Sequence, residues 1–251
     1  MLQTYSVLCR AGKMDNYSYI LHDDKSGITA VIDPSEPAPI ITKLSALSLK
    51  PQYILNTHHH FDHTDGNLEL KNLYRAQVVA NINDKNRIPE FDIGIEPQKT
   101  YTLSPSAGLV SGSLADSDFT FKVIDASAHT QGHVLYYFPL AKALFTGDTL
   151  FNLCIGGLFE GSPEQMFAAL QKIRTLPDDT IFYPGHEYTS GGADAAWHYF
   201  GGNQDIRNYL EKAQKHLQQG LPAGPYTLAE EKKCNPYLAA QTPTEFISLL
   251  K

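Results

Sequence analysis

Residues 57–63, which read Thr-His-His-His-Phe-Asp-His, constrain this chain more than any other segment. They place four imidazoles and a carboxylate directly after the apolar, strand-like run 53–55. Imidazole and carboxylate are ligands for zinc, iron and manganese, and protonated histidines this close together would repel one another. A solvated polar loop is the ordinary alternative, but this run is internal, is interrupted by an acid and follows a strand. The segment therefore predicts a metal site at the end of a β-strand.

Size and charge narrow the class of protein. The 251 residues, 42% of them hydrophobic, suffice for one large domain or a main domain with a smaller appendage. A net charge of -7 without any basic block argues against a nucleic-acid surface. Because no signal peptide or membrane span is recognisable, we expect a cytoplasmic protein with no membrane partner. We also expect a monomer with no nucleic-acid partner. The scattered Cys9, Cys154 and Cys234 fit reduced thiols.

Strand-like and helix-like runs alternate through the first three quarters of the chain. The strand-like runs are 17–21, 28–32, 53–55, 78–80, 119–124, 134–138, 143–145 and 181–183. Apolar residues recur at helical spacing in 39–49 and 163–173, so the pattern favours an α/β fold. Residues 194–218 and 227–233 lack β runs and are predicted to be helical. We therefore predict a main domain over 1–190 and a helical C-terminal region over 191–251.

Three later polar residues share the setting of the first cluster. A short loop separates each of them from the apolar run before it; they are His129, Asp148 and His186. Taken singly, each has an ordinary interpretation as a turn or capping residue. Loops that leave the same edge of a layered sheet converge, however, so we expect the three to join the cluster in one metal centre.

The other histidines are not predicted to be metal ligands. We expect His59 and His133 to orient the ligands or to pack beside them. Surface or ordinary core positions suffice for His22, His198 and His216.

The order of these motifs resembles that of the metallo-β-lactamase superfamily, whose marker Thr-His-x-His-x-Asp-His is matched by residues 57–63. Further segments look like glyoxalase II, the family of hydroxyacylglutathione hydrolases. They are Asp-Asn-Tyr at 15–17, Phe-Thr-Gly-Asp-Thr-Leu-Phe at 145–151, Leu-Phe-Glu-Gly at 158–161, Gly-His-Glu-Tyr-Thr at 185–189 and Asn-Pro-Tyr-Leu at 235–238. The resemblance spans nearly the whole chain.

The resemblance implies a four-layer αββα sandwich, with a helical C-terminal region that binds substrate. It implies two divalent metal ions, with zinc expected and iron or manganese also accommodated. The implied ligands are His58, His60 and His129 for the first ion and Asp62, His63 and His186 for the second, with Asp148 bridging both. The implied reaction is attack of a metal-bound hydroxide on the thioester of S-lactoylglutathione, which yields glutathione and lactate in methylglyoxal detoxification. Asp62 is the candidate proton acceptor, and the candidate substrate contacts are Tyr188, Phe159 and Lys251.

The thiol-binding residues depart from the family pattern. Gly157 stands where the family carries a basic residue, Phe159 lacks a hydroxyl, and Ala239 stands where an arginine is usual. Only Lys251 could replace the basic C-terminal ending, although Lys232 and Lys233 lie in a neighbouring segment. The sequence therefore predicts an intact hydrolytic centre with weaker glutathione binding, or with preference for another thiol.

Other activities remain open at this point. The nearest is a glutathione persulfide dioxygenase with a mononuclear iron, which belongs to the same superfamily. A lactonase or β-lactamase fits the extended glyoxalase-like segments less well. A binding module propped up by a structural metal is the least favoured, since structural zinc sites are closed tetrahedra.

Overall fold

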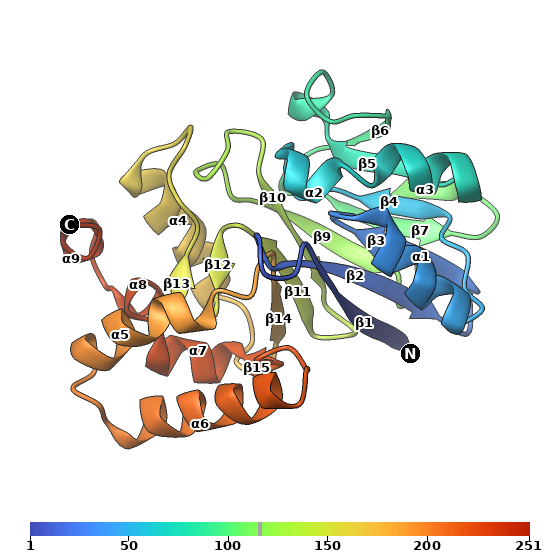
Figure 1. Cartoon of the computed structure of the whole chain (residues 1–251). Helices are drawn as coiled ribbons and strands as arrows, with labels where there is room; N and C mark the ends of the chain where they lie inside the picture. The colour runs from blue at the N-terminus through green and yellow to red at the C-terminus, as the bar shows by residue number, and fades with distance from the viewer. Residues whose placement is uncertain (115–116) are drawn as a thin grey trace. The chain divides into compact units, whose positions relative to one another are not determined.

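The computed structural model describes residues 1–114 and 117–251, which form two compact units. The first unit comprises Met1–Asp125 and Gly132–Ala143, and the second comprises Ala126–Gln131 and Leu144–Lys251. Figure 1 traces both along the chain by colour. Among the described residues, no helix combines the length and the apolar character needed to cross a membrane.

The first unit is built on a six-stranded sheet with the order β1-β2-β3-β4-β5-β6. These strands are β1 (Leu2–Cys9), β2 (Asn16–Asp23), β3 (Ile28–Ile32), β4 (Tyr53–Leu55), β5 (Gln77–Asn81) and β6 (Phe91–Ile95). The first two pairs are antiparallel, and the pairs from β3 to β6 are parallel. The parallel strands are connected through α1 (Pro37–Ala46), α2 (Phe61–Thr64), α3 (Asn67–Tyr74) and the short 3-10 turn η1 (Ile82–Asp84).

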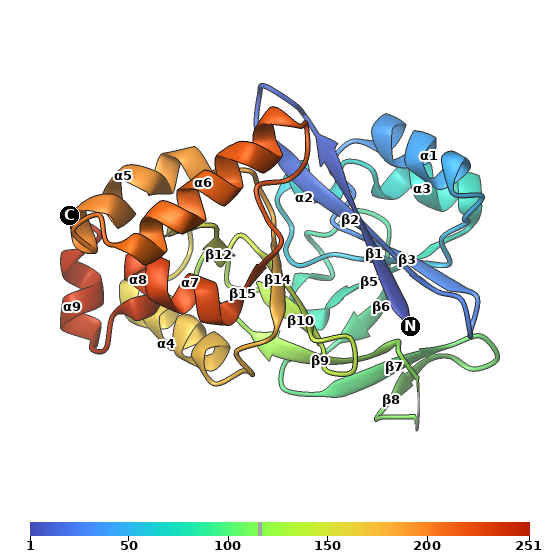
Figure 2. The ribbon, with the colours of Figure 1, turned by 90° about the horizontal axis from the view of Figure 1, so that it is seen from below.

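Strand alternation sends apolar side chains to both faces of this sheet, so the unit has three layers. On one face Ile20, Val31 and Ile54 join a buried cluster with Ile40 of α1 and Leu70 of α3. The other face is covered by β7 (Thr100–Ser104), β8 (Gly108–Ser111), β9 (Thr120–Asp125) and β10 (Val134–Phe138), which hydrogen-bond in the order β10-β9-β7-β8. Figure 2 shows α1 and α3 on one side of the sheet and β7 to β9 on the other.

The second unit combines short strands with six helices. Its strands are β11 (Ala143–Gly147), β14 (Ile181–Pro184) and β15 (Tyr226–Thr227), in the order β15-β14-β11, with the hairpin β12 (Leu150–Phe151) and β13 (Cys154–Ile155). Its helices are α4 (Pro163–Arg174), α5 (Thr189–Tyr199), α6 (Gln204–Gln218), α7 (Leu228–Cys234), α8 (Pro236–Ala239) and α9 (Pro243–Ser248). Ser162 and Gln165 begin α4 with a reciprocal capping box.

The structure confirms the predicted α/β fold and adjusts its elements. The helical segment 194–218 is interrupted at Gly201 and Gly202, whose φ angles are +61° and +60°. Two left-handed residues in succession cannot continue a helix, and a Cβ on Gly202 would lie 2.6 Å from the Trp197 ring. The predicted elements lack β1, β6, β7 and β8 and the two-residue strands β12, β13 and β15. Polarity does not alternate regularly along β1 and β8, whereas β6 and β7 do alternate over five residues, so a local signal for these two strands was present in the sequence.

Candidate metal centre

The cluster 57–63 forms a compact loop and helical turn after β4. The His60 carbonyl accepts hydrogen bonds from the amide of His63 (3.0 Å) and the hydroxyl of Thr64 (3.1 Å), which closes the turn of α2. The side-chain amide of Asn56 donates to the His63 carbonyl at 3.1 Å. Asn67 donates to the Asn56 side-chain oxygen at 2.8 Å, so a buried amide pair holds this turn against the start of α3.

Asp33, which directly follows β3, orients the loop of residues 57–63 through hydrogen bonds. Its carboxylate accepts from the Thr57 amide at 2.7 Å, the Thr57 hydroxyl at 2.6 Å and His63 Nδ1 at 3.1 Å. Both Asp33 and Thr57 are buried, and Asp33 adopts a left-handed φ of +46°. A carboxylate accepts hydrogen bonds, so His63 must carry its proton on Nδ1. The Nε2 atom of neutral His63 is then in the form that binds a metal.

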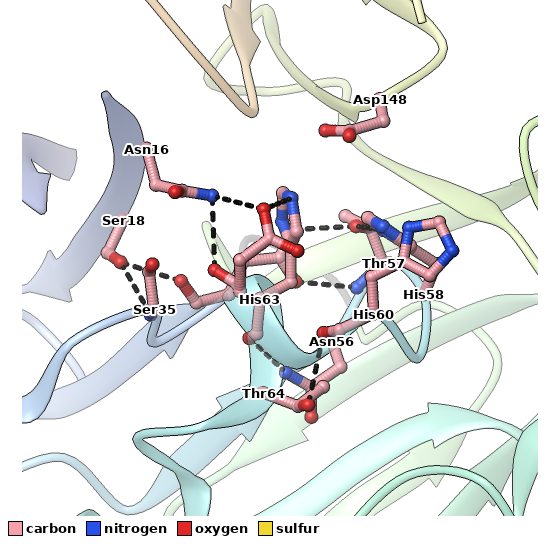
Figure 3. Close-up of polar contacts among 12 residues, drawn as sticks. Asn16, Ser18, Ser35, Asn56, Thr57, His58, His60, His63, Thr64 and Asp148 are labelled. Atoms are coloured by element: carbon pink, nitrogen blue, oxygen red, sulfur yellow. Dashed lines mark hydrogen bonds and ion pairs between the residues drawn. The ribbon is translucent and has the colours of Figure 1, made fainter. Parts of the chain in front are cut away.

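The same reasoning fixes the tautomer of His58. The Thr57 hydroxyl has one proton, which it donates to Asp33, so towards His58 Nδ1 at 3.0 Å it must accept. The proton of neutral His58 therefore lies on Nδ1, and Nε2 is the donor atom for a cation. His58, His60 and His63 lie together in Figure 3, with the His58 ring centroid 4.7 Å from that of His60 and 4.2 Å from that of His63.

Asp62 brings a carboxylate against this group. Its Oδ2 lies 3.5 Å from His63 Nε2 and accepts a hydrogen bond from the Asn16 side-chain amide at 2.9 Å. Asp62 is 5% exposed and His63 is fully buried. A carboxylate oxygen and an unprotonated ring nitrogen facing each other away from water repel unless a proton or a cation lies between them. The first ligand group, defined as His58, His60, Asp62 and His63, is therefore suited to a divalent cation.

The second unit contains the other candidate ligands. The Gly185 amide donates to the Gly147 carbonyl at 2.8 Å, which joins the end of β14 to the end of β11. His186 and Asp148, which follow these strand ends, consequently lie together. Asp148 Oδ2 is 3.3 Å from His186 Nε2 and 3.3 Å from His129 Nε2. We call His129, Asp148 and His186 the second ligand group; all three are buried.

The tautomer of His129 is fixed by a backbone carbonyl. Its Nδ1 lies 2.7 Å from the carbonyl oxygen of Gly157, which can only accept, so the ring proton of neutral His129 is on Nδ1. Nε2 then faces Asp148 as a lone pair, which again favours a cation. The neighbouring glycine is required sterically, because a Cβ on Gly156 would lie 1.8 Å from the carbonyl oxygen of Asp148.

The candidate substrate residues surround the second ligand group unequally. Phe159 is 72% exposed, and its ring meets the His129 ring edge to face at 5.1 Å. The Tyr188 ring stacks on the His186 ring with centroids 4.6 Å apart and remains 37% exposed. Lys251 is exposed and lies three positions after the end of α9.

Gly157, which stands where the resembled family carries a basic residue, lies close to the Phe159 ring. A Cβ on Gly157 would lie 3.2 Å from the Phe159 ring, which is closer than ordinary contact. Lys232 and Lys233 lie in the segment that could supply a cation in place of the missing basic residues. The Lys232 ammonium already donates hydrogen bonds to Asp178 at 2.6 Å and to the Leu176 carbonyl at 3.3 Å. Lys233 lies on α7 and lines a surface pocket with Asp205 of α6.

The remaining histidines have ordinary surroundings. The His133 ring stacks on the His58 ring at 4.8 Å, and His59 Nδ1 lies 3.6 Å from Asp84 Oδ2. His22 contacts the Thr29 hydroxyl, His216 contacts the carbonyls of Ala223 and Gly224, and His198 is exposed.

Sequence reasoning did not assign a role to several residues that orient these ligands. Asp33 appeared only as the end of a strand before a proline, Thr57 only as part of a motif, and Gly156 only as part of a departure from it. The one available signal was the Asp33-Pro34 pair, since a polar residue at a strand end often faces a site.

Comparison with known proteins identifies two matching family models. Residues 11–186 match the metallo-β-lactamase superfamily. Residues 187–245 match the C-terminus of hydroxyacylglutathione hydrolase. The two matches adjoin, and together they account for most of the chain.

Similar proteins give the same result along most of the length. The chain is 39% identical to a hydroxyacylglutathione hydrolase of Pelagibacter ubique, over 94% of this chain and 93% of the relative. It is 38% identical to one from Methylococcus capsulatus, over 91% and 84% respectively. Among solved structures it resembles ETHE1 from Myxococcus xanthus, with a TM-score of 0.69 and 22% identity over 99% of this chain and 89% of that one. It also resembles the B3 metallo-β-lactamase BLEG-1, with a TM-score of 0.63 and 23% identity over 95% and 100%.

Proposed function

We propose a thioester hydrolase function for this chain, which belongs to the hydroxyacylglutathione hydrolase family of the metallo-β-lactamase superfamily. The substrate is S-2-hydroxyacylglutathione, such as S-lactoylglutathione, and the products are glutathione and a 2-hydroxy acid such as lactate. The type of reaction is inferred from family membership. The structures that resemble the chain at 22% and 23% identity support the fold alone.

The two ligand groups support a dinuclear centre. In the proposed assignment the first ion is held by His58, His60 and His129, the second by Asp62, His63 and His186, and Asp148 bridges them. The single most telling observation is that one oxygen of Asp148 lies 3.3 Å from both His129 Nε2 and His186 Nε2. A bridging carboxylate has this relation to two imidazoles that bind different ions.

Metal identity is proposed from the donor set. Five imidazoles and two carboxylates suit zinc first, with iron or manganese also accommodated. A structure of TTHA1623 in a di-iron-bound form, with a TM-score of 0.58 and 25% identity over 72% of this chain and 91% of that one, supports iron as an alternative. When bound, two such ions lower the pKa of water far enough to supply a nucleophile at neutral pH and polarise the thioester carbonyl.

The protein residues supply orientation and proton transfer. The Asn16 amide holds the Asp62 carboxylate beside His63, where we propose that Asp62 accepts the proton of the attacking water. The departing thiol needs little protonation, because its pKa lies far below that of an alcohol. Phe159 and Tyr188 each present an exposed aromatic ring next to a proposed ligand, which suits the apolar part of the thioester.

The thiol pocket is proposed to bind glutathione weakly. Gly157 provides no cation, the Phe159 ring lies close to the place where one would begin, and Lys232 is paired with Asp178. Glutathione carries two carboxylates, and each missing exposed charge pair costs up to about 1 kcal/mol, or about fivefold in affinity. We therefore expect a raised KM for S-lactoylglutathione compared with a lactoyl thioester of a less anionic thiol. Equal or lower KM for the glutathione thioester would refute this part of the proposal.

One preparation tests the reaction and the metal together. The metal content of the purified protein is measured on the sample used for S-lactoylglutathione hydrolysis, with a parallel oxygen-electrode assay on glutathione persulfide. Hydrolysis with about two ions per chain supports the proposal. Oxygen consumption with a single iron and no hydrolysis would replace it with the persulfide dioxygenase, and one tightly held ion with neither activity would indicate a structural site.

The wider organisation is also a proposal. A catalytic domain over 1–190 and a helical substrate-binding region over 191–251 are supported by the adjoining family matches, which meet between residues 186 and 187. The unpaired Cys9, Cys154 and Cys234 support a reducing, cytoplasmic location. A monomer is expected, and light scattering in solution tests it.

A further inference from the structure

The hairpin of β12 and β13 has a turn that the local sequence does not favour. Asn152 and Leu153 connect the two strands, and Leu153 adopts a left-handed φ of +64°. Glycine and asparagine tolerate this conformation, but a leucine side chain does so only when surrounding structure holds it there. Leu153 is fully buried, so the hairpin is held by contacts from elsewhere in the second unit.

Two side chains from the C-terminal helical region provide those contacts. Glu231 of α7 accepts a hydrogen bond from the Leu153 amide at 2.7 Å. The side-chain amide of Asn235, between α7 and α8, donates to the Cys154 carbonyl at 3.0 Å and to Glu231 at 2.8 Å. The other oxygen of Glu231 accepts from the Tyr209 hydroxyl of α6 at 2.6 Å. Glu231 and Asn235 are both fully buried.

The hairpin leads directly into the residues that orient the second ligand group. Strand β13 ends one residue before Gly156, whose backbone lies against the Asp148 carbonyl without room for a Cβ. The next residue, Gly157, accepts the hydrogen bond from His129 Nδ1 at 2.7 Å. A displacement of the Leu153 turn would therefore move the carbonyl that selects the tautomer of His129.

We propose that Glu231 and Asn235 are positioning residues for the metal centre, acting through the β12–β13 hairpin on His129 and Asp148. The C-terminal helical region then has a second task besides substrate binding, because it sets the geometry of ligands that precede it in the chain by about 80 to 100 residues. This inference rests on the proposed ligand role of His129 and Asp148. A purely structural role would lower stability without changing the metal affinity of the folded protein.

Four variants separate these possibilities. Glu231→Leu removes both acceptors, and Asn235→Ser removes the amide donor while keeping an N-cap for α8, where Asn235 now accepts from the Tyr237 amide at 3.0 Å. Glu231→Gln keeps an acceptor of the same size. Phe246→Leu, a buried change in α9 away from the hairpin, is the control for lost stability.

The readouts are the affinity for zinc, by chelator competition, and the visible spectrum after substitution with cobalt, both below the unfolding temperature of each variant. We expect Glu231→Leu and Asn235→Ser to weaken zinc binding about 10- to 100-fold, as loss of ligand-orienting partners does elsewhere, and to shift the cobalt bands. Glu231→Gln and Phe246→Leu should retain both properties.

Three results would overturn the inference. The first is unchanged affinity and spectrum in both Glu231→Leu and Asn235→Ser, and the second is an equal loss in Phe246→Leu. If Glu231→Leu does not fold, Asn235→Ser decides alone. The third is a wild-type protein that binds no metal, which would overturn the proposed function as well, whereas the first two leave that function standing.

Discussion

Glu231 should make the stability of this protein depend on pH in an unusual direction. Burial raises the pKa of its carboxyl from 4.5 to about 7, although hydrogen bonds from Tyr209, Asn235 and Leu153 partly oppose the rise. The folded protein therefore binds more protons than the unfolded chain between these two values. The stabilisation is complete below pH 4.5 and is lost as the pH rises through about 7.

The size of the effect follows from the same values. One pKa unit corresponds to about 1.4 kcal/mol, so the rise from 4.5 to about 7 costs the folded protein about 3 kcal/mol once the pH exceeds both. Glu231→Gln removes the ionisation and keeps an acceptor for the Leu153 amide. We expect this variant to gain about 3 kcal/mol relative to the wild type between pH 4.5 and pH 8.

Urea unfolding of the metal-free proteins, followed by fluorescence of the single tryptophan, measures this difference at each pH. That residue, Trp197, lies in α5 of the same unit as Glu231. Glu245→Gln, in α9 of the same unit, is the control: hydrogen bonds from the Tyr199 hydroxyl and the Gln241 amide hold the pKa of Glu245 below 4.5, so its difference should stay flat above pH 5. A flat difference for Glu231→Gln would show that Glu231 is already ionised in the folded protein and would refute the reasoning.

Other predictions concern the site. Thr57→Val deprives His58 Nδ1 of its acceptor, so zinc affinity by chelator competition should fall about 10- to 100-fold, and an unchanged affinity would contradict the assigned tautomer. Gly156→Ala should abolish activity or folding, because the new Cβ would lie 1.8 Å from the Asp148 carbonyl oxygen. The control is Gly191→Ala, whose Cβ meets nothing within 4 Å. In thermal unfolding this control should be neutral or should stabilise α5 by up to about 1 kcal/mol. Chelation should remove thioester hydrolysis, and added zinc should restore it; activity that survives complete metal removal would end the dinuclear proposal.

Local patterns predicted most of the buried architecture. The runs 28–32, 53–55 and 134–138 correspond to β3, β4 and β10 without change, because buried strands carry uninterrupted apolar residues. The helix predicted over 163–173 ends one residue later, at Arg174. Prediction failed at Gly201 and Gly202, where a local glycine pair that ends the helix was read as part of it, and at strands such as β8, which gain their structure from a neighbour.

The candidate ligands could be named from the chain alone because metal affinity resides in residue type, and the position after an apolar run is a local property. The resemblance to the family was recognised from the same sequence motifs, and the comparisons support it. The proton positions on the rings could not be read in this way. They depend on Asp33, 24 residues before Thr57, and on the Gly157 carbonyl, 28 residues after His129.

The same division applies to the hairpin that supports the site. Leu153 and Glu231 are 78 residues apart, and nothing local to either one predicts their hydrogen bond. The raised pKa of Glu231 likewise comes from burial, which exists only after α6, α7 and the hairpin have packed together. Composition and spacing thus determine which groups are candidate metal ligands, whereas long-range hydrogen bonds and the exclusion of water determine the protonation state and orientation of those groups.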